Sequence, residues 1–327
     1  MAIDILNIQP SVISRDLKGK YIAIYGKEKV GKTSFAASFP KNLILSFEIG
    51  TNALSGIRAQ KIERWSDFKL VLRQLEKPEA QAMYDTISID TVTIAWDLCE
   101  SYICAQHGVQ KIADIPWGGG YAACKKEFES CLRKVTMLGY GIVLISHDAK
   151  RIEKTPDGSE IEILFPDVPK RARDIVNQLV DIIGYIGVEW DAEGNSQRYL
   201  YTRQTPTIMA GSRYKYLDPK IKFGYSELVN AVANAIEKAE KLDGAIVVDE
   251  VVQTVVEKLN YEEVRSKAFD LWVKLVGEGE TADAEMAQRI LKKVEMIFGR
   301  PIKLSEITED QVDLFNLVVL EMEDMKK

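Results

Sequence analysis

One short stretch of this chain has the residue types and the spacing needed to hold phosphate groups. It runs from Gly26 to Thr33, reads Gly-Lys-Glu-Lys-Val-Gly-Lys-Thr, and matches the P-loop pattern. The two glycines let the backbone curl so that its N–H groups point towards phosphate oxygens. Lys32 would neutralise the β- and γ-phosphates, and the Thr33 hydroxyl would hold Mg²⁺. The stretch therefore predicts a nucleoside triphosphate site, and a chance glycine turn is the alternative.

The segments on either side of this stretch fit the same interpretation. Tyr21–Tyr25 is an apolar run suited to a buried strand, and Ser34–Phe39 is expected to continue as a helix that stops at Pro40. The amino end of that helix adds a positive dipole end. The predicted nucleotide-binding residues are Gly26, Lys27, Glu28, Lys29, Val30, Gly31, Lys32, Thr33 and Ser34.

Two carboxylates follow predicted buried strands. Thr86–Asp90 is an apolar strand closed by Asp90, the pattern of a Walker B strand, so Asp90 should lie beside Thr33 and orient Mg²⁺ with it. Asn42–Phe47 is a second strand, followed by Glu48. Any buried strand can end in Asp, and the spacing after a P-loop is what favours the metal site.

The order of elements predicts an α/β fold. Strands and helices alternate through Gly141–Ser146, a strand followed by His147, which indicates a mostly parallel sheet with helices on both faces. A turn at Pro156–Gly158 then indicates a hairpin. Asp181–Val188 and Gln197–Arg203 are interpreted as an antiparallel extension of the sheet. Other expected elements are an edge strand at Ile3–Ile8 and helices at Ala122–Leu138 and Val176–Leu179.

The end of the chain is different in pattern and charge. Apolar residues recur every three or four positions from Val247 onward, which predicts a small helical domain. Residues 243–327 carry 19 acidic and 11 basic residues, net −8, which leaves 32 basic and 30 acidic residues elsewhere, net +2. We therefore expect a nucleotide-binding domain over residues 1–243 and an acidic helical domain over residues 244–327. The predicted helices are Val248–Leu259, Tyr261–Val276, Ala282–Phe298 and Thr308–Met325.

Composition narrows the class of protein further. The chain has 327 residues with 46% hydrophobic and 28% charged residues, as expected of a globular protein with a full core. No apolar run approaches membrane-spanning length and no signal peptide is visible, so we expect a cytoplasmic protein. The four cysteines fall in predicted helices and are expected to be reduced. A zinc site that uses Cys104 and His107 is the less favoured alternative.

Together these motifs resemble the RecA-like ATPase core. More narrowly, the chain resembles the nucleotide-binding ATPases of phage replication and recombination modules, which are related to RecA and RadA and linked to single-strand annealing. The resemblance covers residues 18–240. It implies a RecA-like P-loop core that uses ATP and Mg²⁺, in a phage protein of the bacterial host cytoplasm.

The resemblance also implies roles for three further residues. Glu48 would polarise the attacking water, with a plain loop carboxylate as the alternative. His147 would sense the γ-phosphate, although RecA has a glutamine there, and a histidine bonded to a backbone carbonyl is the alternative. Arg213, in the basic motif Gly211–Lys215, would reach the nucleotide of a neighbouring subunit, or else be an ordinary solvated residue. The predicted catalytic residues are thus Lys32, Glu48, Asp90, His147 and Arg213, with Thr33 and Asp90 for the metal.

In RecA-like proteins two loops bind DNA, and their position here implies His107–Tyr121 and Ala149–Arg173. The first would be a flexible arm whose aromatic side chains stack on bases, and the second would contact phosphates. The implied DNA-contacting residues are Trp117, Tyr121, Lys150, Arg151, Lys154, Arg171 and Arg173, although a solvated basic surface has the same composition.

Three functions compete on this sequence. The first is an oligomeric RecA-like ATPase that acts on single-stranded DNA in phage recombination or replication. The second is an ATP-regulated loader or adaptor whose acidic helices bind a replication or single-strand-binding protein. The third is a small-molecule kinase, which the late antiparallel strands and the lack of an obvious lid disfavour.

Overall fold

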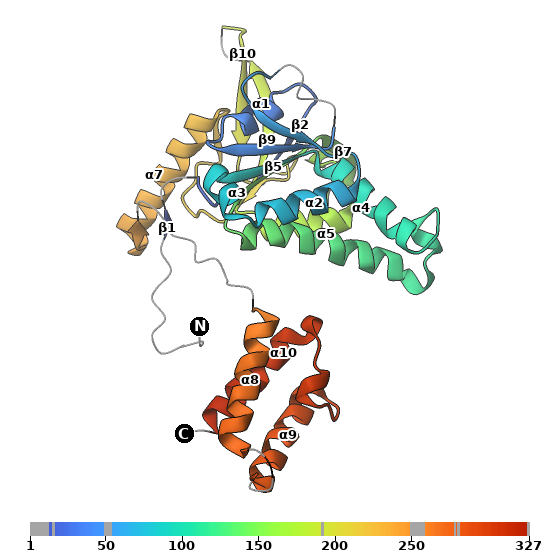
Figure 1. The fold of residues 1–327 in the computed structure, drawn as a ribbon. Coiled ribbons are helices and arrows are strands. Elements are labelled where there is room, and N and C mark those ends of the chain that lie inside the picture. The colour runs from blue at the N-terminus through green and yellow to red at the C-terminus, as the bar shows by residue number, and fades with distance from the viewer. Residues whose placement is uncertain are drawn as a thin grey trace. The chain divides into compact units, whose positions relative to one another are not determined.

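The computed structural model divides the chain into two compact units, Met1–Val255 and Val256–Lys327 (Figure 1). It describes residues 13–14, 17–48, 54–190, 193–248, 259–277, 279 and 282–325. An edge strand predicted at Ile3–Ile8 lies outside these residues. The helix predicted at Val248–Leu259 also lies outside them, apart from its two end residues.

The first unit is built on one large sheet. Its strands run in the order β12-β10-β9-β2-β6-β5-β3-β4, with β11 also paired to β9. The strands from β9 to β4 are parallel, and β10, β11 and β12 are antiparallel to their neighbours. The strand bounds are β2 (Tyr21–Gly26), β3 (Asn42–Ser46), β4 (Arg58–Lys61), β5 (Thr86–Asp90), β6 (Gly141–Ser146), β9 (Ile182–Trp190), β10 (Ser196–Tyr201), β11 (Gly211–Ser212) and β12 (Lys220–Lys222). The predicted fold class, a mostly parallel P-loop core with an antiparallel extension, is confirmed.

The central strands are apolar because helices cover both of their faces. Almost every residue of β2, β3, β5 and β6 is buried, as expected of a parallel sheet between two helical layers. One face packs on α1 and α7, and the other packs on α2, α4, α5 and α6 (Figure 1). The helix bounds are α1 (Lys32–Ala37), α2 (Trp65–Leu75), α3 (Pro78–Met83), α4 (Val92–Gln106), α5 (Gly119–Met137), α6 (Lys170–Leu179) and α7 (Tyr225–Asp243).

The order of the central strands decides which side chains can meet. The P-loop follows β2 and Asp90 ends β5, but these two strands are not neighbours, because β6 lies between them. Since all three are parallel, their carboxyl ends lie at one edge of the sheet. His147 follows β6 and so lies between the loop and Asp90.

The segment predicted as a flexible glycine-rich arm is instead mostly helical. Two short 3₁₀ turns, Ile112–Asp114 and Pro116–Gly118, lead into α5, which begins at Gly119 rather than at the predicted Ala122. A Cβ on Gly120 would lie 2.6 Å from the carbonyl oxygen of Ile112, so close packing requires this glycine. The prediction of a loop over the whole of His107–Tyr121 was therefore wrong.

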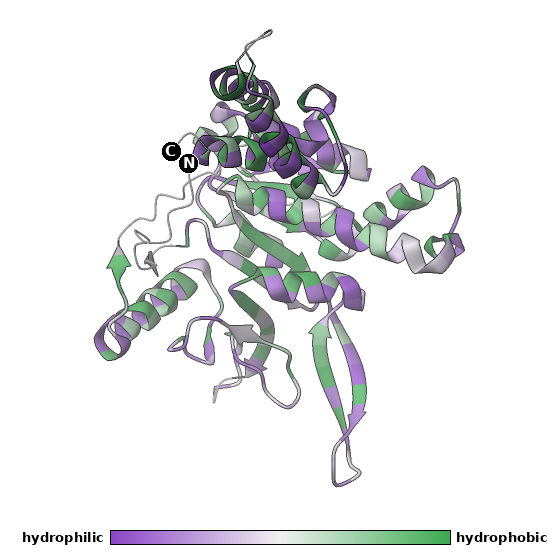
Figure 2. Ribbon diagram, turned by 90° about the horizontal axis from the view of Figure 1, so that it is seen from below, coloured by the Kyte–Doolittle hydropathy of each residue, from purple (hydrophilic) through white to green (hydrophobic). Residues whose placement is uncertain are grey.

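The predicted hairpin is present and projects from the sheet (Figure 2). It consists of β7 (Asp148–Lys154) and β8 (Glu160–Pro166). The single proton of the Tyr25 hydroxyl on β2 is shared between the carbonyl oxygens of Met209 (2.6 Å) and of Leu164 on β8 (3.1 Å), which holds the base of the hairpin against β2. The next helix, α6, begins at Lys170, six residues earlier than the predicted Val176. The second predicted DNA loop is therefore a hairpin followed by the first turn of a helix.

The second unit is a small helical module with an apolar core. It contains α8 (Tyr261–Val276), α9 (Ala284–Phe298) and α10 (Val312–Asp324). Asn260 caps α8 by accepting from the backbone N–H groups of Glu262 and Glu263, and Asp283 caps α9 by accepting from Met286 N. The predicted starts of α9 and α10 were two and four residues too early.

The described residues bear on two further predictions, one about membrane-spanning helices and one about a zinc site. No helix in this part of the chain is both long and apolar enough to cross a lipid bilayer. The same part holds no group of three or more metal-binding side chains, so the zinc alternative at Cys104 and His107 has no support. All four cysteines are free and buried, and the sulfur atoms of Cys99 and Cys124 are 3.8 Å apart. Apart from the large sheet, two short strands, β1 (Ile13–Ser14) and β13 (Val247–Val248), form a separate parallel pair.

Candidate nucleotide-binding site

The predicted P-loop connects β2 to α1 and bends as phosphate binding requires. Lys29 has φ 59° and Gly31 has φ 104°, so the loop uses left-handed backbone on both sides of Val30. A Cβ on Gly26 would lie 2.9 Å from the carbonyl oxygen of Ile186 on β9. Both glycines of the pattern therefore have a structural cause, the first in close packing and the second in its backbone angle.

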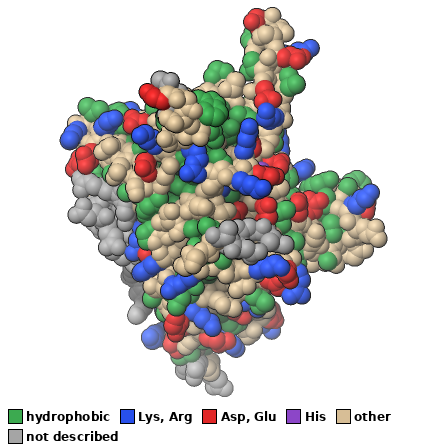
Figure 3. Space-filling view, turned by 90° about the horizontal axis from the view of Figure 1, so that it is seen from above, with side chains coloured by type: hydrophobic (Ala, Val, Ile, Leu, Met, Phe, Trp, Pro, Cys, Tyr) green, Lys and Arg blue, Asp and Glu red, His purple; other side chains and the backbone are tan. Residues whose placement is uncertain are grey.

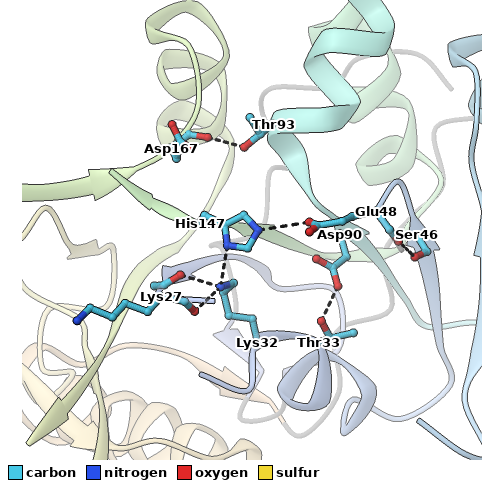
Figure 4. Close-up of polar contacts among 10 residues, drawn as sticks. Lys27, Lys32, Thr33, Ser46, Glu48, Asp90, Thr93, His147 and Asp167 are labelled. Atoms are coloured by element: carbon cyan, nitrogen blue, oxygen red, sulfur yellow. Dashed lines mark hydrogen bonds and ion pairs between the residues drawn. The ribbon is translucent and has the colours of Figure 1, made fainter. Parts of the chain in front are cut away.

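The Lys32 side chain is folded into this loop. Its side chain is buried, with the whole residue 6% exposed, and its ammonium group donates to the carbonyl oxygens of Gly26 and Lys27, both at 2.7 Å. The loop carbonyls thereby hold the charge of Lys32 at the centre of the bend (Figure 4). An anionic phosphate in the same bend would give this ammonium group a stronger partner than neutral carbonyls.

Thr33 and Asp90 are joined directly. The Thr33 hydroxyl donates to Asp90 Oδ2 at 2.7 Å, and Asp90 is buried at the end of β5. A hydroxyl and a carboxylate oxygen are the hard donors that Mg²⁺ prefers, so the two residues chosen from the sequence for the metal fit that ion.

Glu48 is placed at the same edge by the backbone that follows β3. The backbone N–H groups of Phe47 and Glu48 donate to the Asp90 carbonyl at 2.7 and 3.2 Å, and Ser46 Oγ donates to the Glu48 carbonyl at 2.6 Å. The carboxylate of Glu48 is 46% exposed, unlike that of Asp90. Its backbone is fixed while its oxygens remain accessible to water.

His147 connects the loop lysine to this glutamate. Its Nδ1 lies 3.4 Å from Lys32 Nζ, and its Nε2 lies 3.3 Å from Glu48 Oε2 (Figure 4). One neutral tautomer satisfies both contacts: Nδ1 accepts from Lys32 and Nε2–H donates to Glu48. Its imidazole is therefore bonded to side chains of the site, and the alternative of a histidine bonded to a backbone carbonyl does not describe these contacts.

Burial shifts the pKa values of the two central charges in opposite directions. Burial lowers the pKa of Lys32, although Asp90, Asp148, Glu48 and Glu28 act against that shift. Burial likewise raises the pKa of Asp90, against the hydrogen bond from Thr33. Both shifts mean that the charged forms are disfavoured here, as expected where a polyanion and a cation would stabilise them.

Arg198 also belongs to the site, although no motif in the sequence indicated it. From β10, its Nη1 donates to the Val30 carbonyl at 2.9 Å, and its guanidinium lies 5.5 Å from the centre of the Phe223 ring. Phe223 in turn stacks on Phe35 of α1. A Cβ on Gly31 would lie 2.5 Å from Arg198 Nη1, so this arginine lies directly against the loop. Only the pairing of β10 with β9 brings it there.

Arg213 lies at the opposite edge of the sheet. Its guanidinium donates to Asp181 Oδ1 (3.1 Å) and to the Gln178 carbonyl (2.5 Å). Asp181 also accepts from the N–H of Tyr21, the first residue of β2, whereas the P-loop follows the last. Six residues of strand, roughly 20 Å, separate the two edges. Any contact of Arg213 with a nucleotide would therefore be with that of another subunit.

The structure brings some of the predicted DNA-contacting residues together. The Arg171 guanidinium lies 4.3 Å from the centre of the Tyr121 ring, which joins the two predicted loops at one place. Arg151 and Arg173 both lie over the Phe165 ring, at 5.4 and 4.7 Å.

The remaining predicted DNA contacts are separate from that cluster. Trp117 is fully exposed, in a left-handed backbone conformation. The β7–β8 hairpin carries Lys150, Arg151 and Lys154 but five acidic residues, so its own charge does not attract a polyanion. Lys150 is paired with Glu162 at 2.7 Å. On the face shown in Figure 3, acidic and basic side chains are likewise interspersed.

Comparison with known proteins adds family relationships. A family model described as an AAA domain matches residues 18–214, which include every predicted catalytic residue. The SPbeta prophage-derived uncharacterized protein YorG of Bacillus subtilis (strain 168) is 29% identical over 336 residues, covering 99% of both chains. Among solved structures, the flagellar accessory protein FlaH from Methanocaldococcus jannaschii matches with 13% identity and a TM-score of 0.34, over 63% of this chain and 85% of that one.

Proposed function

This chain belongs to the AAA domain family, and on that premise we propose that it is a magnesium-dependent ATPase. One observation carries the proposal. A lysine, a hydroxyl–carboxylate pair and an accessible glutamate meet at the carboxyl edge of one parallel sheet, around a glycine loop. Phosphoryl transfer to water needs a cation for the phosphates, a metal site and a group that orients the water, and this edge offers all three.

Each side chain has a definable task in hydrolysis. Lys32 would exchange its carbonyl partners for phosphate oxygens, and Thr33 and Asp90 would hold Mg²⁺. When bound, Mg²⁺ neutralises phosphate charge and fixes the geometry of the chain of phosphates. Glu48 accepts a hydrogen bond from the attacking water and orients it, because its carboxylate is accessible and its backbone is fixed. His147 keeps that carboxylate in place through Nε2–H and responds to movement of Lys32 through Nδ1.

We further propose that the protein acts on single-stranded DNA as an oligomer in the host cytoplasm, in phage recombination or replication. The prophage origin stated for YorG, which aligns over 99% of both chains, supports a phage protein. Exposed Trp117 and the Tyr121–Arg171 pair offer flat groups for base stacking. Arg213, which points away from its own P-loop, would act on a neighbouring nucleotide in such an oligomer.

The test is ATP hydrolysis with and without single-stranded DNA, measured together with the mass in solution. We expect Mg²⁺-dependent turnover that DNA stimulates, and loss of that stimulation in a Trp117→Ala, Arg171→Ala double variant with unchanged basal turnover. Turnover without any response to DNA would reject the DNA part alone. Mixing Arg213→Ala with Lys32→Ala subunits tests the shared site, because each variant supplies what the other lacks; no recovered activity would reject it.

A second candidate function, an ATP-regulated loader or adaptor, is favoured by the surface of the helical unit. Leu314, Leu317 and Leu320 of α10 are all at least 37% exposed, and their spacing puts them on one face of the helix. Between residues 304 and 325 the sequence has seven acidic residues and no lysine or arginine. An apolar stripe among carboxylates suits a basic amphipathic segment of a replication protein. Turnover stimulated by such a protein and not by DNA would favour this function over the first.

A further inference from the structure

The β9–β10 hairpin extends beyond the edge of the sheet at which the P-loop lies. Gly26, the last residue of β2, is opposite Ile186 on β9. β9 continues four residues past that point to Trp190, and β10 returns from Ser196. At the usual rise of a strand, the hairpin rises roughly 13 Å above the level of Gly26. Figure 1 shows β10 projecting on the side of α1.

The pairing of the two strands identifies which side chains face the P-loop. Val188 is opposite Arg198, and Trp190 is opposite Ser196. Residues that are opposite one another share a face of the sheet, and alternate residues of one strand do so too. Because Arg198 contacts the Val30 carbonyl, Val188 and Trp190 lie on the same face of the sheet as the P-loop. Along β9, Trp190 is further than Val188 from the level of Gly26.

This face combines an exposed apolar surface with a fixed cation. Val188 is 53% exposed and Trp190 is 75% exposed, although both are large apolar residues. Below them, Arg198 uses one nitrogen for the Val30 carbonyl and lies on the Phe223 ring, which leaves further N–H donors for a ligand. Moving away from the loop, the order is therefore phosphate loop, guanidinium and indole. That is also the order of charge and flat apolar surface along a nucleoside triphosphate.

We propose that this face of the β9–β10 hairpin binds the base end of the nucleotide held by the P-loop. Trp190 stacks on the nucleobase, Val188 forms the adjoining apolar wall, and Arg198 contacts the α- or β-phosphate from the same subunit. The inference rests on the proposed function, because it requires a nucleotide at the P-loop. It makes Arg198 a cation supplied in cis, in contrast to the role proposed for Arg213.

The experiment separates base binding from phosphate binding with two probes. Affinity is measured by calorimetry for ATP and for tripolyphosphate, each with Mg²⁺, on the full chain. Trp190→Ala is expected to weaken ATP binding about tenfold, the typical effect of losing one stacked aromatic group, and to leave tripolyphosphate binding unchanged. Trp190→Phe should restore ATP affinity to within about threefold because it keeps an aromatic face. Ile152→Ala is the matched control, since that large apolar side chain is also exposed (67%) on a hairpin, the β7–β8 hairpin, and it should change neither affinity.

Arg198 has a different signature in the same assay. Arg198→Gln is expected to weaken ATP and tripolyphosphate equally, by about tenfold, because the lost contacts are to phosphate. For Trp190→Ala, two results would overturn the proposal: unchanged ATP binding, or an equal loss of affinity for ATP and tripolyphosphate. A change of mass in solution without a change of ATP affinity would also overturn it, by showing that the hairpin is a subunit contact. If the unaltered chain binds neither probe, the proposed function itself fails.

Discussion

The two units of this protein differ in what they bury. Among the described residues of the first unit, nine polar or charged ones are buried, and five of them are at or next to its nucleotide edge: Lys32, Ser46, Asp90, Thr91 and Ser146. In the described part of the second unit, 259–277, 279 and 282–325, every buried side chain is apolar. The helices of the second unit pack through apolar side chains alone, so packing by itself does not require buried polar groups.

The difference separates the requirements of folding from those of binding. Taking a charge out of water costs free energy unless a partner replaces the lost hydration. No charged side chain is buried in the described part of the second unit, whereas the first unit buries Lys32 and Asp90 at one edge, where a few hydrogen bonds stabilise them. Thr91, next to Asp90, even has a buried hydroxyl without a partner among the described residues. A ligand of opposite charge distribution would offset these costs, which a purely structural account of the edge leaves unexplained.

The largest effect is expected from the buried lysine. Lys32→Ala should reduce ATP turnover by at least about a thousandfold, because the ammonium group that stabilises the transferred phosphate is lost. The fold should remain intact, since alanine is a good helix former at this first position of α1, and the substitution removes a charge that burial disfavours. Lys27→Ala is the matched control, because that side chain is exposed and the substitution keeps the backbone N–H through which the loop would contact phosphate. Normal turnover in Lys32→Ala would show that the buried charges of this edge do not serve catalysis.

Glu48 is expected to have the next largest effect, because it is accessible where Lys32 is not. Glu48→Gln should lower turnover about a hundredfold and leave ATP affinity within about twofold, since only the orientation of water is lost. Single-turnover hydrolysis and ATP binding, measured on one preparation, test this. Parallel loss of turnover and affinity would instead place Glu48 in nucleotide binding, and undiminished turnover would make it the plain loop carboxylate.

Local pattern and tertiary pairing explain which parts of this site the sequence could predict. Gly26, Gly31 and Lys32 belong to one contiguous motif, and Asp90 ends a run whose apolar residues identify the strand, so both were predictable. Arg198 was missed because its place depends on the register of β10 against β9, which no local pattern encodes. The start of α5 was wrong because a glycine needed for packing, Gly120, looks the same in sequence as one needed for flexibility.

Substitution of Asp90 is expected to have a smaller effect, on thermal stability, and the direction of the change in Tm tests whether burial of this carboxylate costs stability. Burial raises its pKa in the folded protein, so folding favours the protonated form. Above that pKa the ionised carboxylate lowers the free energy of unfolding. Asp90→Asn removes the charge and can still accept the Thr33 hydrogen bond. It should therefore raise the Tm of the nucleotide-free protein at neutral pH while abolishing Mg²⁺-dependent turnover.

The advantage of Asp90→Asn should also depend on pH. As pH falls through the raised pKa the native carboxylate takes up a proton, so the difference in Tm between the two proteins should shrink towards about pH 4, near the ordinary aspartate value. Thermal unfolding of both proteins across this range, without Mg²⁺, measures it. A Tm of Asp90→Asn that equals or falls below that of the unaltered chain at neutral pH would mean that Asp90 is not strained by burial.

The smallest expected effect on turnover comes from the second unit. Val318 is buried in the apolar core of α10 and its neighbour Leu317 is about half exposed, so the two form a matched pair. Val318→Asp puts an unpaired charge into that core, which costs several kcal/mol, on the order of 3–5, and should unfold the unit. Leu317→Asp should leave it folded.

Because every residue of the candidate site belongs to the first unit, basal ATP turnover should stay within about twofold in both variants. Calorimetric unfolding, followed beside the hydrolysis assay, should show one transition lost in Val318→Asp only. If turnover fell together with that transition, the helical unit would be required for the chemistry of the first unit, and the expectation that the nucleotide site works without it would be wrong.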